Sequence, residues 1–401
     1  MLILLPLLLI LVLSYWAALE YLRQQWLSIP SVVAPPAVRK EVCLISLVVV
    51  VRNEAPNLPL LFRALEGQSL APQLFELHLV DDSSTDESLQ IATAFKERAA
   101  FNVNVHRLNR SAADGGFVAG GSPKKAAITQ VLPHCRGNII AVTDGDCIPG
   151  QQWLSRILSL WQQEQPCFIS GPVRYVGERS LFEKMQALDF TALIGVGASM
   201  LHSGRPGMCN AANMAFSKQA FREVGGYTGN EHVPSGDDEF LLQKLAKLYP
   251  DRIAFMKAEG AVVSTGACGS WQEFVQQRKR WAGKWRLHKG IASKLPPVLV
   301  FLFYLLITFS YGLAFWQPAA CLYILPLLLL KAVADYRFLA PVLNFLKKPL
   351  SLKVFLLMEL VYPFYVLFFA LVANTGSFTW KERNYRYTTS EHERTGVSRV
   401  G

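Results

Sequence analysis

Hydrophobic residues follow two patterns along this chain of 401 residues. Residues 1–22 and 298–374 hold long apolar runs, whereas residues 41–290 alternate short apolar runs with helical periodicities. An apolar run of about 18 residues or more is long enough to cross a bilayer as a helix. We therefore expect an N-terminal transmembrane anchor (1–22), a globular domain (41–290), a C-terminal transmembrane region (298–374) and a basic tail (375–401).

The membrane segments are predicted from these runs and from the residues that flank them. No basic residue precedes the first segment and no clear cleavage site follows it, so we expect an uncleaved anchor rather than a signal peptide. Residues 299–316 and 319–333 form a pair joined by a turn at Gln317 and Pro318, and residues 354–373 form a further segment.

Basic residues lie next to these segments, and the formal net charge is +10. Because Lys and Arg favour the cytoplasmic side, we expect an integral membrane protein of a bacterial inner or plasma membrane with a cytoplasmic domain. We therefore expect the positive charge to interact with an anionic membrane surface and not with nucleic acid. The stretch before the second segment has no acidic residue and holds Arg278, Lys279, Arg280, Lys284, Arg286, Lys289 and Lys294.

The tail conflicts with a simple count of the segments. If all four segments cross, the tail lies outside, yet it carries Lys381, Arg383 and Arg386. Either one hydrophobic segment does not cross or the charge rule fails at this point.

The middle of the chain predicts an α/β domain with a mostly parallel sheet, because strand-like runs alternate with helical ones. In such sheets ligands bind beyond the carboxyl ends of the strands. Polar residues follow three of the runs, at 52–54, 81–84 and 144–146. The predicted strands are 44–51, 75–80, 102–108 and 139–143, and the predicted helices are 57–66, 87–99 and 123–132.

Asp144 and Asp146 are candidate ligands of a divalent metal, magnesium or manganese. Two carboxylates two residues apart in extended chain point to the same side, and oxygen ligands suit these ions. Gly145 between them would let a ligand approach the backbone. A surface turn is the alternative, since Asp-Gly is a common turn pair. The seven cysteines lack CxxC spacing, so they predict neither a zinc site nor a disulfide framework.

Two further acidic groups follow apolar runs or open helices. Asp82 follows a predicted strand, where a carboxylate can accept hydrogen bonds from a ribose or a base, or can cap the next helix. Asp237, Asp238 and Glu239 open an apolar-periodic helix. Helix capping explains one acidic residue at this position. Three adjacent acidic residues repel one another, which favours a role in binding a metal or a cationic partner, or in proton transfer.

Gln277, Arg280 and Trp281 share one face of a predicted helix. A guanidinium can hold a diphosphate, and an indole can form the floor of a sugar or acceptor pocket. A basic helix lying on anionic lipid is the alternative. The two interpretations are compatible if Arg278 and Lys279 point away from the site.

The order of these motifs resembles family 2 glycosyltransferases, in particular the membrane-embedded branch of cellulose, chitin and hyaluronan synthases and ceramide glucosyltransferase. The resemblance covers about residues 43–290 and the membrane layout, and each motif alone is weak. It implies a GT-A fold and inverting transfer. The motifs are Asn53-Glu54, Asp81-Asp82-Ser83-Ser84, Asp144-Gly145-Asp146 (DxD), Gly236-Asp237-Asp238 and Gln277-Arg278-Lys279-Arg280-Trp281 (QxxRW).

The resemblance also assigns roles to residues of this chain. Asp144 and Asp146 match the metal ligands, Asp238 matches the general base, and the region of Asn213 matches the lining of the acceptor pocket. The chain departs from the family at Asp237, where Glu is frequent, and at Val50 and Val51, but no needed functional group is lost. The residues that match donor-binding positions are Glu54, Asp82, Lys125, Gln277, Arg280 and Trp281.

The expected function is metal-dependent transfer of a sugar from a nucleotide-diphosphate sugar, such as a UDP-sugar, to a lipid or glycan acceptor at the membrane. A processive polysaccharide synthase is an alternative, but four or fewer spans leave little material for a polymer channel. A nonenzymatic nucleotide-binding membrane scaffold is the other alternative, and it predicts that the base or a metal ligand is missing.

Overall fold

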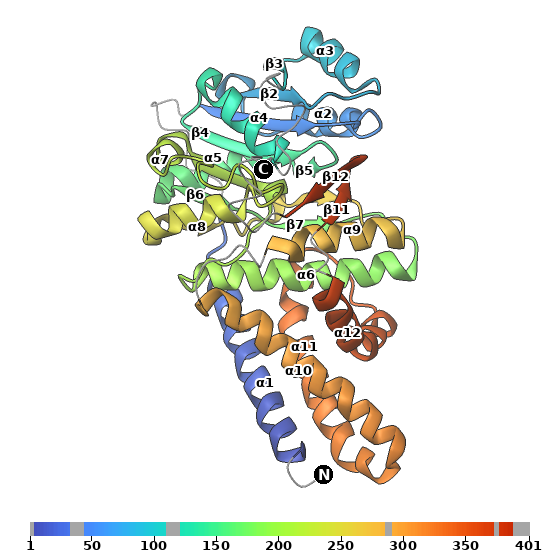
Figure 1. Cartoon of the computed structure of the whole chain (residues 1–401). Helices are drawn as coiled ribbons and strands as arrows, with labels where there is room; N and C mark the ends of the chain where they lie inside the picture. The colour runs from blue at the N-terminus through green and yellow to red at the C-terminus, as the bar shows by residue number, and fades with distance from the viewer. Residues whose placement is uncertain (1–3, 33–43, 110–120, 285–290, 373–376, 388–401) are drawn as a thin grey trace, which may run out of the picture.

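The computed structural model describes residues 4–32, 44–109, 121–284, 291–372 and 377–387. It has an α/β part above a set of long apolar helices (Figure 1). Some residues of the predicted basic flanks lie outside the described ranges, namely Arg39, Lys40, Arg286 and Lys289.

A seven-stranded sheet forms the centre of the α/β part, in the order β3-β2-β1-β4-β8-β6-β9. Strand β8 is antiparallel to β4 and β6, and the other neighbours are parallel. The sheet is therefore mostly parallel, as the alternation of strands and helices predicted. Its strands are β1 (Ile45–Val51), β2 (Phe75–Asp81), β3 (Asn102–Arg107), β4 (Ile139–Asp144), β6 (Phe168–Ser170), β8 (Met214–Ser217) and β9 (Ile253–Phe255). A smaller sheet holds β5 (Ile148–Pro149), β7 (Val173–Tyr175) and β10 (Val263–Thr265).

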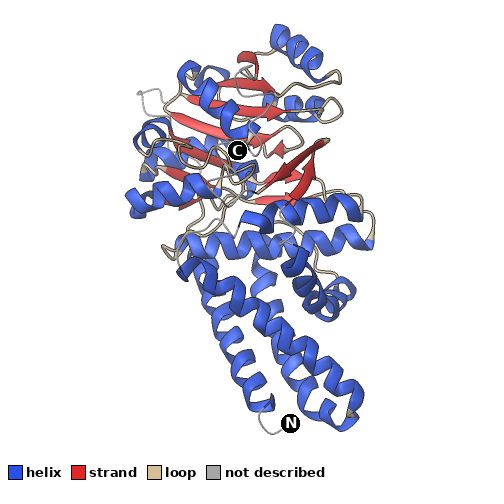
Figure 2. Ribbon diagram, in the orientation of Figure 1, coloured by secondary structure: helices blue, strands red, loops and turns tan. Residues whose placement is uncertain are grey.

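Helices cover both faces of this sheet, and a buried core lies on each side. Phe62 of α2 stacks on Phe95 of α3 at 4.0 Å between ring centroids. Such apolar contacts hold the helices on the faces of the sheet (Figure 2). These helices are α2 (Leu58–Glu66), α3 (Ser88–Arg98), α4 (Pro123–Val131), α5 (Trp153–Glu164), α7 (Lys218–Glu223) and α8 (Glu239–Leu248).

Two helices, α6 (Leu181–His202) and α9 (Trp271–Ala282), form a layer between the sheet and the long apolar helices (Figure 1). Ser180 and Glu183 form a capping box that starts α6. Leu188 of α6 is buried against Leu343 and Phe355 of the apolar helices. A Cβ on Gly195 would lie 2.8 Å from the side chain of Val342, so α6 packs closely on its neighbour.

Four described helices are long and apolar enough to span a membrane, as the apolar runs predicted. They are α1 (Leu4–Ser28), α10 (Ile291–Trp316), α11 (Cys321–Phe345) and α12 (Leu352–Val372). Two of them, α1 and α11, continue beyond their predicted C-terminal ends, because these ends pack on the α/β part. Trp26 of α1 contacts Phe255 and Phe345, and the last turns of α11 pack on α6.

Both ends of α12 lie at the α/β part. Before α12, Lys347 pairs with Glu259 at 2.8 Å, and Lys348 pairs with Glu178 at 2.6 Å. After α12, the predicted basic tail contains a hairpin of β11 (Ser377–Trp380) and β12 (Arg383–Arg386). Figure 1 shows this hairpin beside the sheet, with α1, α10 and α11 extending away and α12 below α6 and α9. Residues 388–401 of the predicted tail are outside the described part.

Candidate active site

The strand register brings together the polar residues that follow β1, β2 and β4. Val51 of β1 pairs with Asp81 of β2, and Val50 pairs with Asp144 of β4. Because parallel strands in register end at the same edge, the segments 52–54, 81–84 and 144–146 meet there. The predicted site at this edge therefore has a structural basis in three aligned strand ends.

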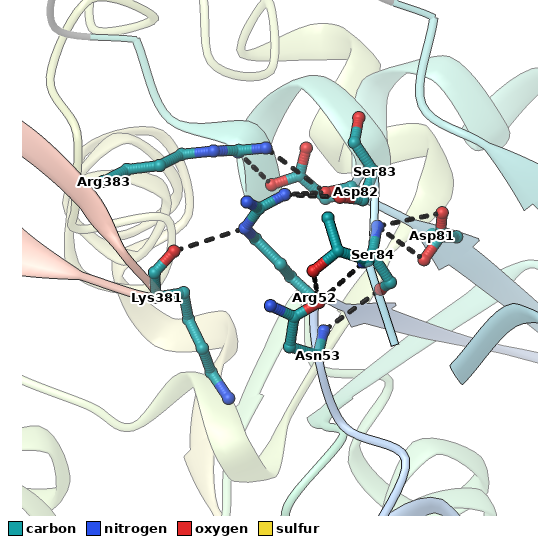
Figure 3. A network of polar contacts seen from close by, with 9 residues as sticks. Arg52, Asn53, Asp81, Asp82, Ser83, Ser84, Lys381 and Arg383 are labelled. Atoms are coloured by element: carbon teal, nitrogen blue, oxygen red, sulfur yellow. Dashed lines mark hydrogen bonds and ion pairs between the residues drawn. The ribbon is translucent and has the colours of Figure 1, made fainter. Parts of the chain in front are cut away.

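The turns after β1 and β2 hold each other in place (Figure 3). Asn53 and Ser83 have positive φ angles of 52° and 55°. Asn53 N–H donates to Ser84 Oγ at 3.0 Å, and Thr85 N–H donates to Asn53 Oδ1 at 2.9 Å. Arg52 adds hydrogen bonds to the carbonyl oxygens of Asp82 and Ser83. A positive φ costs free energy in any residue other than glycine, and these hydrogen bonds compensate for that cost at Asn53 and Ser83.

Glu54 and Asp82, the two carboxylates predicted to hold the nucleoside, are buried and face the C-terminal hairpin. Lys381 Nζ lies 2.8 Å from Glu54 Oε1. Arg383 Nη1 lies 2.7 Å from Asp82 Oδ2 (Figure 3). Glu54 also accepts a hydrogen bond from Asn57. The hairpin therefore places two cations on the two carboxylates.

Asp144 and Asp146 lie together, as their spacing predicted. A carboxylate oxygen from each and the thiol of Cys147 lie within 4.8 Å of one another. Loss of hydration among protein groups, and then the charges of Asp144 and Glu54, raise the pKa of Asp146 to about 6. Crowded carboxylates of this kind favour a cation between them. Burial also raises the pKa of Cys147 well above its usual range, so the thiol is a poor ligand and the carboxylate oxygens suit magnesium or manganese.

Gly145 makes room for neighbouring side chains at the site. A Cβ at this position would lie 2.9 Å from both Glu54 Cγ and Val51 Cγ1. The close position of the Glu54 side chain therefore requires glycine here, and the approach of a ligand to the Gly145 backbone stays a prediction.

Lys124, and not the predicted Lys125, reaches the acidic site. The Lys124 amine pairs with Asp144 and lies 3.5 Å from Asp237. The Lys125 amine instead donates to the carbonyl oxygens of Asn230, at 2.8 Å, and Val233. Adjacent residues on a helix point about 100° apart, so only one of the two can face the strand end. Burial lowers the pKa of Lys125 to about 8.

Asp238 begins α8 and lies among charged groups. Gly236 precedes it with a φ of 75°, which turns the chain into the helix. Asp238 accepts hydrogen bonds from Glu239 N–H, at 2.7 Å, and from Ala211 N–H. Lys284 lies 2.8 Å from Glu239 and 3.9 Å from Asp238. A helix N-terminus favours the ionised form of an acid, but burial, and then the charges of Asp237 and Glu239, raise the pKa of Asp238.

The helix α9 brings Arg280 to the hairpin and Arg278 into the interior. The Arg280 guanidinium lies 5.8 Å from the centroid of the Trp380 ring, and Tyr387 Oη–H donates to the Arg280 carbonyl. Gln277 lies one turn before Arg280, and Gln277 Oε1 is buried. Trp281 is half-buried and lies 4.5 Å from the guanidinium of Arg278.

Arg278 points into the interior of the protein and not toward lipid, as the alternative of a basic helix on anionic lipid would need. Its side chain is buried and pairs with Asp189 of α6 at 2.7 Å. The aromatic rings of Phe274 and Trp281 shield it, with centroids 4.8 and 4.5 Å from the guanidinium. A buried arginine needs such a partner, because an unpaired buried charge is costly.

The buried side chain of Asn213 links α5 to the segments around Pro172 and Ala261. Its amide oxygen accepts from Trp153 Nε1 at 2.8 Å, and its amide nitrogen donates to the carbonyl oxygens of Pro172 and Ala261. These bonds use its donor and acceptor groups inside the protein. The expectation that the Asn213 region lines an acceptor pocket therefore does not apply to this side chain.

The sequence interpretation missed the hairpin and Lys124. An alternation of aromatic and polar residues around Trp380 and Tyr385 is typical of strands and could have indicated the hairpin. Its turn residues Lys381 and Glu382 both have positive φ, as two-residue hairpin turns require. No comparable signal separates Lys124 from Lys125, because the orientation of α4 decides which one faces the site.

Comparison with known protein families adds independent evidence. The model of Glycosyl transferase family 2 matches residues 46–225, and that of Glycosyl transferase family group 2 matches residues 139–378. Glycosyltransferase AglE of Haloferax volcanii is 32% identical over 131 residues, which cover 33% of this chain and 40% of that protein. Beta-monoglucosyldiacylglycerol synthase of a Nostoc species is 27% identical over 241 residues, which cover 59% of this chain and 48% of that protein. The chain thus spans about half or less of these curated relatives.

A solved structure gives the same fold. The mannosyltransferase PcManGT from Pyrobaculum calidifontis, solved in complex with GDP-mannose and Mn2+, superposes with a TM-score of 0.51 at 16% sequence identity. The match covers 92% of this chain and 99% of that chain. The α/β part therefore has the GT-A fold, with apolar helices at both ends, as predicted.

Proposed function

The chain belongs to glycosyl transferase family 2, and we propose that it moves a sugar from a nucleotide-diphosphate donor to a membrane lipid with inversion at the transferred carbon. The single observation that carries the site assignment is the register of β1, β2 and β4, which gathers Glu54, Asp82, Asp144 and Asp146 at one sheet edge. Such an edge is where ligands bind in sheets of this kind. Residues 41–290 and the hairpin are the proposed catalytic unit.

The donor is proposed to bind across this edge. Glu54 and Asp82 would accept hydrogen bonds from the nucleoside, and we expect a UDP-sugar, as in the branch that the motifs resemble. Three residues of α9 would bind the diphosphate and line the acceptor side of the pocket, namely Gln277, Arg280 and Trp281. Lys124 replaces Lys125 in this proposal, because its amine lies at the carboxylates.

A divalent cation, magnesium or manganese, is proposed to bind to Asp144 and Asp146. The close carboxylate oxygens and the raised pKa of Asp146 fit a cation site. A bound cation would supply positive charge to the diphosphate leaving group. The residues Asp144, Lys124 and Asp237 form a chain of ion pairs from this point to α8.

Asp238 is the proposed general base. The acceptor hydroxyl would attack the anomeric carbon as the bond to the diphosphate breaks, and its proton would pass to Asp238. Attack from the face opposite to the leaving group inverts the configuration. A base needs its ionised form, and the nearby Lys284 favours that form against the effect of burial.

The acceptor is proposed to be a lipid, because α6 and α9 join the site to the apolar helices. Relatives named for glucosyldiacylglycerol synthesis and for undecaprenyl-phosphate transfer agree with this proposal. We propose single additions, because α1, α10 and α11 alone provide little material for a polymer channel. We also propose that these helices cross the membrane with the catalytic unit in the cytoplasm, and that α12 does not cross.

The proposed function is tested with the purified full chain in lipid nanodiscs. UDP- and GDP-sugars would be supplied one at a time with Mn2+, with dioleoylglycerol or undecaprenyl phosphate as acceptor. We expect one donor to yield a glycosylated lipid by mass spectrometry, with a β-linkage from an α-linked donor by NMR. A product with retained configuration, or transfer to soluble glycans alone, would contradict the proposal.

A further inference from the structure

An apolar cavity lies between α6, α9 and α12, beyond the candidate active site. Its volume is about 320 Å³, within the usual range of about 300–1,000 Å³ for ligand pockets. Phe274 of α9, Met185 of α6 and Tyr365 of α12 are among its lining residues. Each of the three helices therefore contributes a wall.

The polar groups that line this cavity are already engaged inside the protein. Gln186 exchanges two hydrogen bonds with the backbone of Cys268, at 2.9 and 3.0 Å. Asp189 pairs with Arg278 at 2.7 Å and accepts from the hydroxyls of Tyr362 and Tyr365. A ligand in this cavity finds apolar and aromatic surface and a neutralised charge pair, which suits a hydrocarbon chain and not a phosphate or a sugar.

The cavity opens toward the surface that α12 presents to the membrane. Val361, Phe364 and Phe368 line the cavity, yet their side chains are 36%, 49% and 43% exposed. The segments on both sides of α12 contact the α/β part, so under the proposed topology this helix lies at the membrane surface nearest the active site. Trp271 on the rim is 53% exposed, and tryptophan favours the interface between lipid and water.

One helix connects the cavity with the candidate active site. Phe274 of α9 lines the cavity, and Arg280 of the same helix lies six residues further on, about 9 Å along the helix axis. A chain held in the cavity would therefore place its head group close to the residues proposed to bind the donor. Lipid tails are already in an apolar phase, so the cavity would act by positioning the acceptor rather than by removing it from water.

We propose that the cavity between α6, α9 and α12 binds a hydrocarbon chain of the lipid acceptor, which enters from the leaflet that faces the catalytic unit. The inference rests on the proposed function for the identity of the lipid as acceptor. Beyond the proposed function, the inference specifies the cavity that binds the lipid and the leaflet from which the lipid enters.

The test uses a diacylglycerol that carries a diazirine in one acyl chain, in phosphatidylcholine nanodiscs with the full chain. On irradiation, we expect label in peptides of α6, α9 and α12. Excess dioleoylglycerol should remove this label, and the same excess of added phosphatidylcholine should not. Equal competition by phosphatidylcholine would mean that the cavity holds bulk lipid, and it would overturn the proposal.

A matched pair of variants on α12 locates the label. Val361→Trp fills the cavity, whereas Leu360→Trp adds the same side chain at a 58% exposed position outside its lining. We expect labelling to fall at least fivefold in V361W and to stay unchanged in L360W, with both folds checked by thermal unfolding. Equal labelling in the two variants would overturn the proposal. Labelling of the cavity without sugar transfer to dioleoylglycerol would instead contradict the proposed acceptor and leave the lipid site supported.

Discussion

At the scale of single residues, the site depends on a few carboxylates whose neighbours set their charge. The spacing of Asp144 and Asp146 was enough to predict that they lie together, since it follows from strand geometry. The choice between Lys124 and Lys125 could not be predicted, because it depends on how α4 rests on the sheet.

Asp146→Asn tests the proposed metal site. Asn keeps the shape and removes a charge that Asp144 and Glu54 oppose, so the fold should be as stable as in the native protein or more so. We expect transfer to fall on the order of 10²–10³-fold, as when a group that stabilises a transition-state charge is lost. Rates across a Mn2+ titration measure this, with Cys147→Ser as a control that keeps activity. Full native activity in excess chelator would exclude the metal.

Asp238→Asn tests the proposed base. Asn keeps the size and can still accept one of the two hydrogen bonds that Asp238 accepts, from Glu239 N–H or from Ala211 N–H, but it cannot take a proton. Loss of a general base costs on the order of 10²–10⁴ in rate, so we expect near-normal donor binding and at least about a hundredfold slower transfer. Calorimetry gives donor affinity, and product formation at saturating donor gives the rate. Loss of donor binding would make Asp238 a ligand, and unchanged transfer would move the base to Asp237 or Glu239.

Lys284→Met tests the electrostatics around that base. Burial, and then Asp237 and Glu239, raise the pKa of Asp238, whereas Lys284 lowers it. The base is active when ionised, so transfer is lost as pH falls through this pKa. Without the cation the pKa rises further, and we expect the acid limb of the pH–rate profile to move to higher pH. Lys244→Met is the matched control, because its amine bonds only to the carbonyl oxygens of Gly226 and Thr228 among the described contacts. An unmoved acid limb would show that Asp238 does not control it.

At the scale of elements, strands and helices with long periodic runs were predicted, whereas the hairpin was missed because its aromatic alternation is short. The run 44–51 is buried and β-branched, so it could only be an interior strand. The hairpin has strands of four residues each, and it packs on residues that are distant in sequence, among them Glu54, Asp82 and Val233. Its strands therefore lack a long periodic pattern of their own.

Arg383→Ala tests whether the hairpin competes with the donor. Asp82 is 1% exposed and pairs with Arg383, so a nucleoside that bonds to Asp82 must displace this arginine. We expect the variant to bind the donor about threefold or more tightly, because the donor no longer has to displace the arginine. A tenfold change in affinity would correspond to about 1.4 kcal/mol of binding free energy. Calorimetry with the donor measures the change, and Glu382→Gln in the hairpin turn is the control. Weaker donor binding would instead make Arg383 part of the donor site.

At the scale of the whole molecule, apolar length predicted which helices meet the membrane but not which of them cross it. Length and composition are alike for α10 and α12, each with a mean hydropathy of 2.2. The difference lies in contacts made by the connecting segments. Under the proposed topology, those contacts would remove the conflict raised by the basic tail, because a helix with both ends at the catalytic unit keeps Lys381 and Arg383 on the same side as that unit.

The resulting topology gives a final prediction for single cysteines in a cysteine-free background. The exposed positions Gln151, Gln317 and Glu382 lie in the α/β part, in the turn between α10 and α11, and in the hairpin, respectively. With α1, α10 and α11 crossing, Gln317→Cys should react with an impermeant maleimide in intact cells. Gln151→Cys and Glu382→Cys should react only after the membrane is opened. The pairing of Glu382→Cys with Gln151→Cys is the decisive comparison, because a crossing α12 would place the hairpin outside and the domain inside. Labelling of Glu382→Cys in intact cells would therefore refute both the position of α12 at the inner surface and the contact of Arg383 with Asp82, since one hairpin cannot occupy both sides of the bilayer.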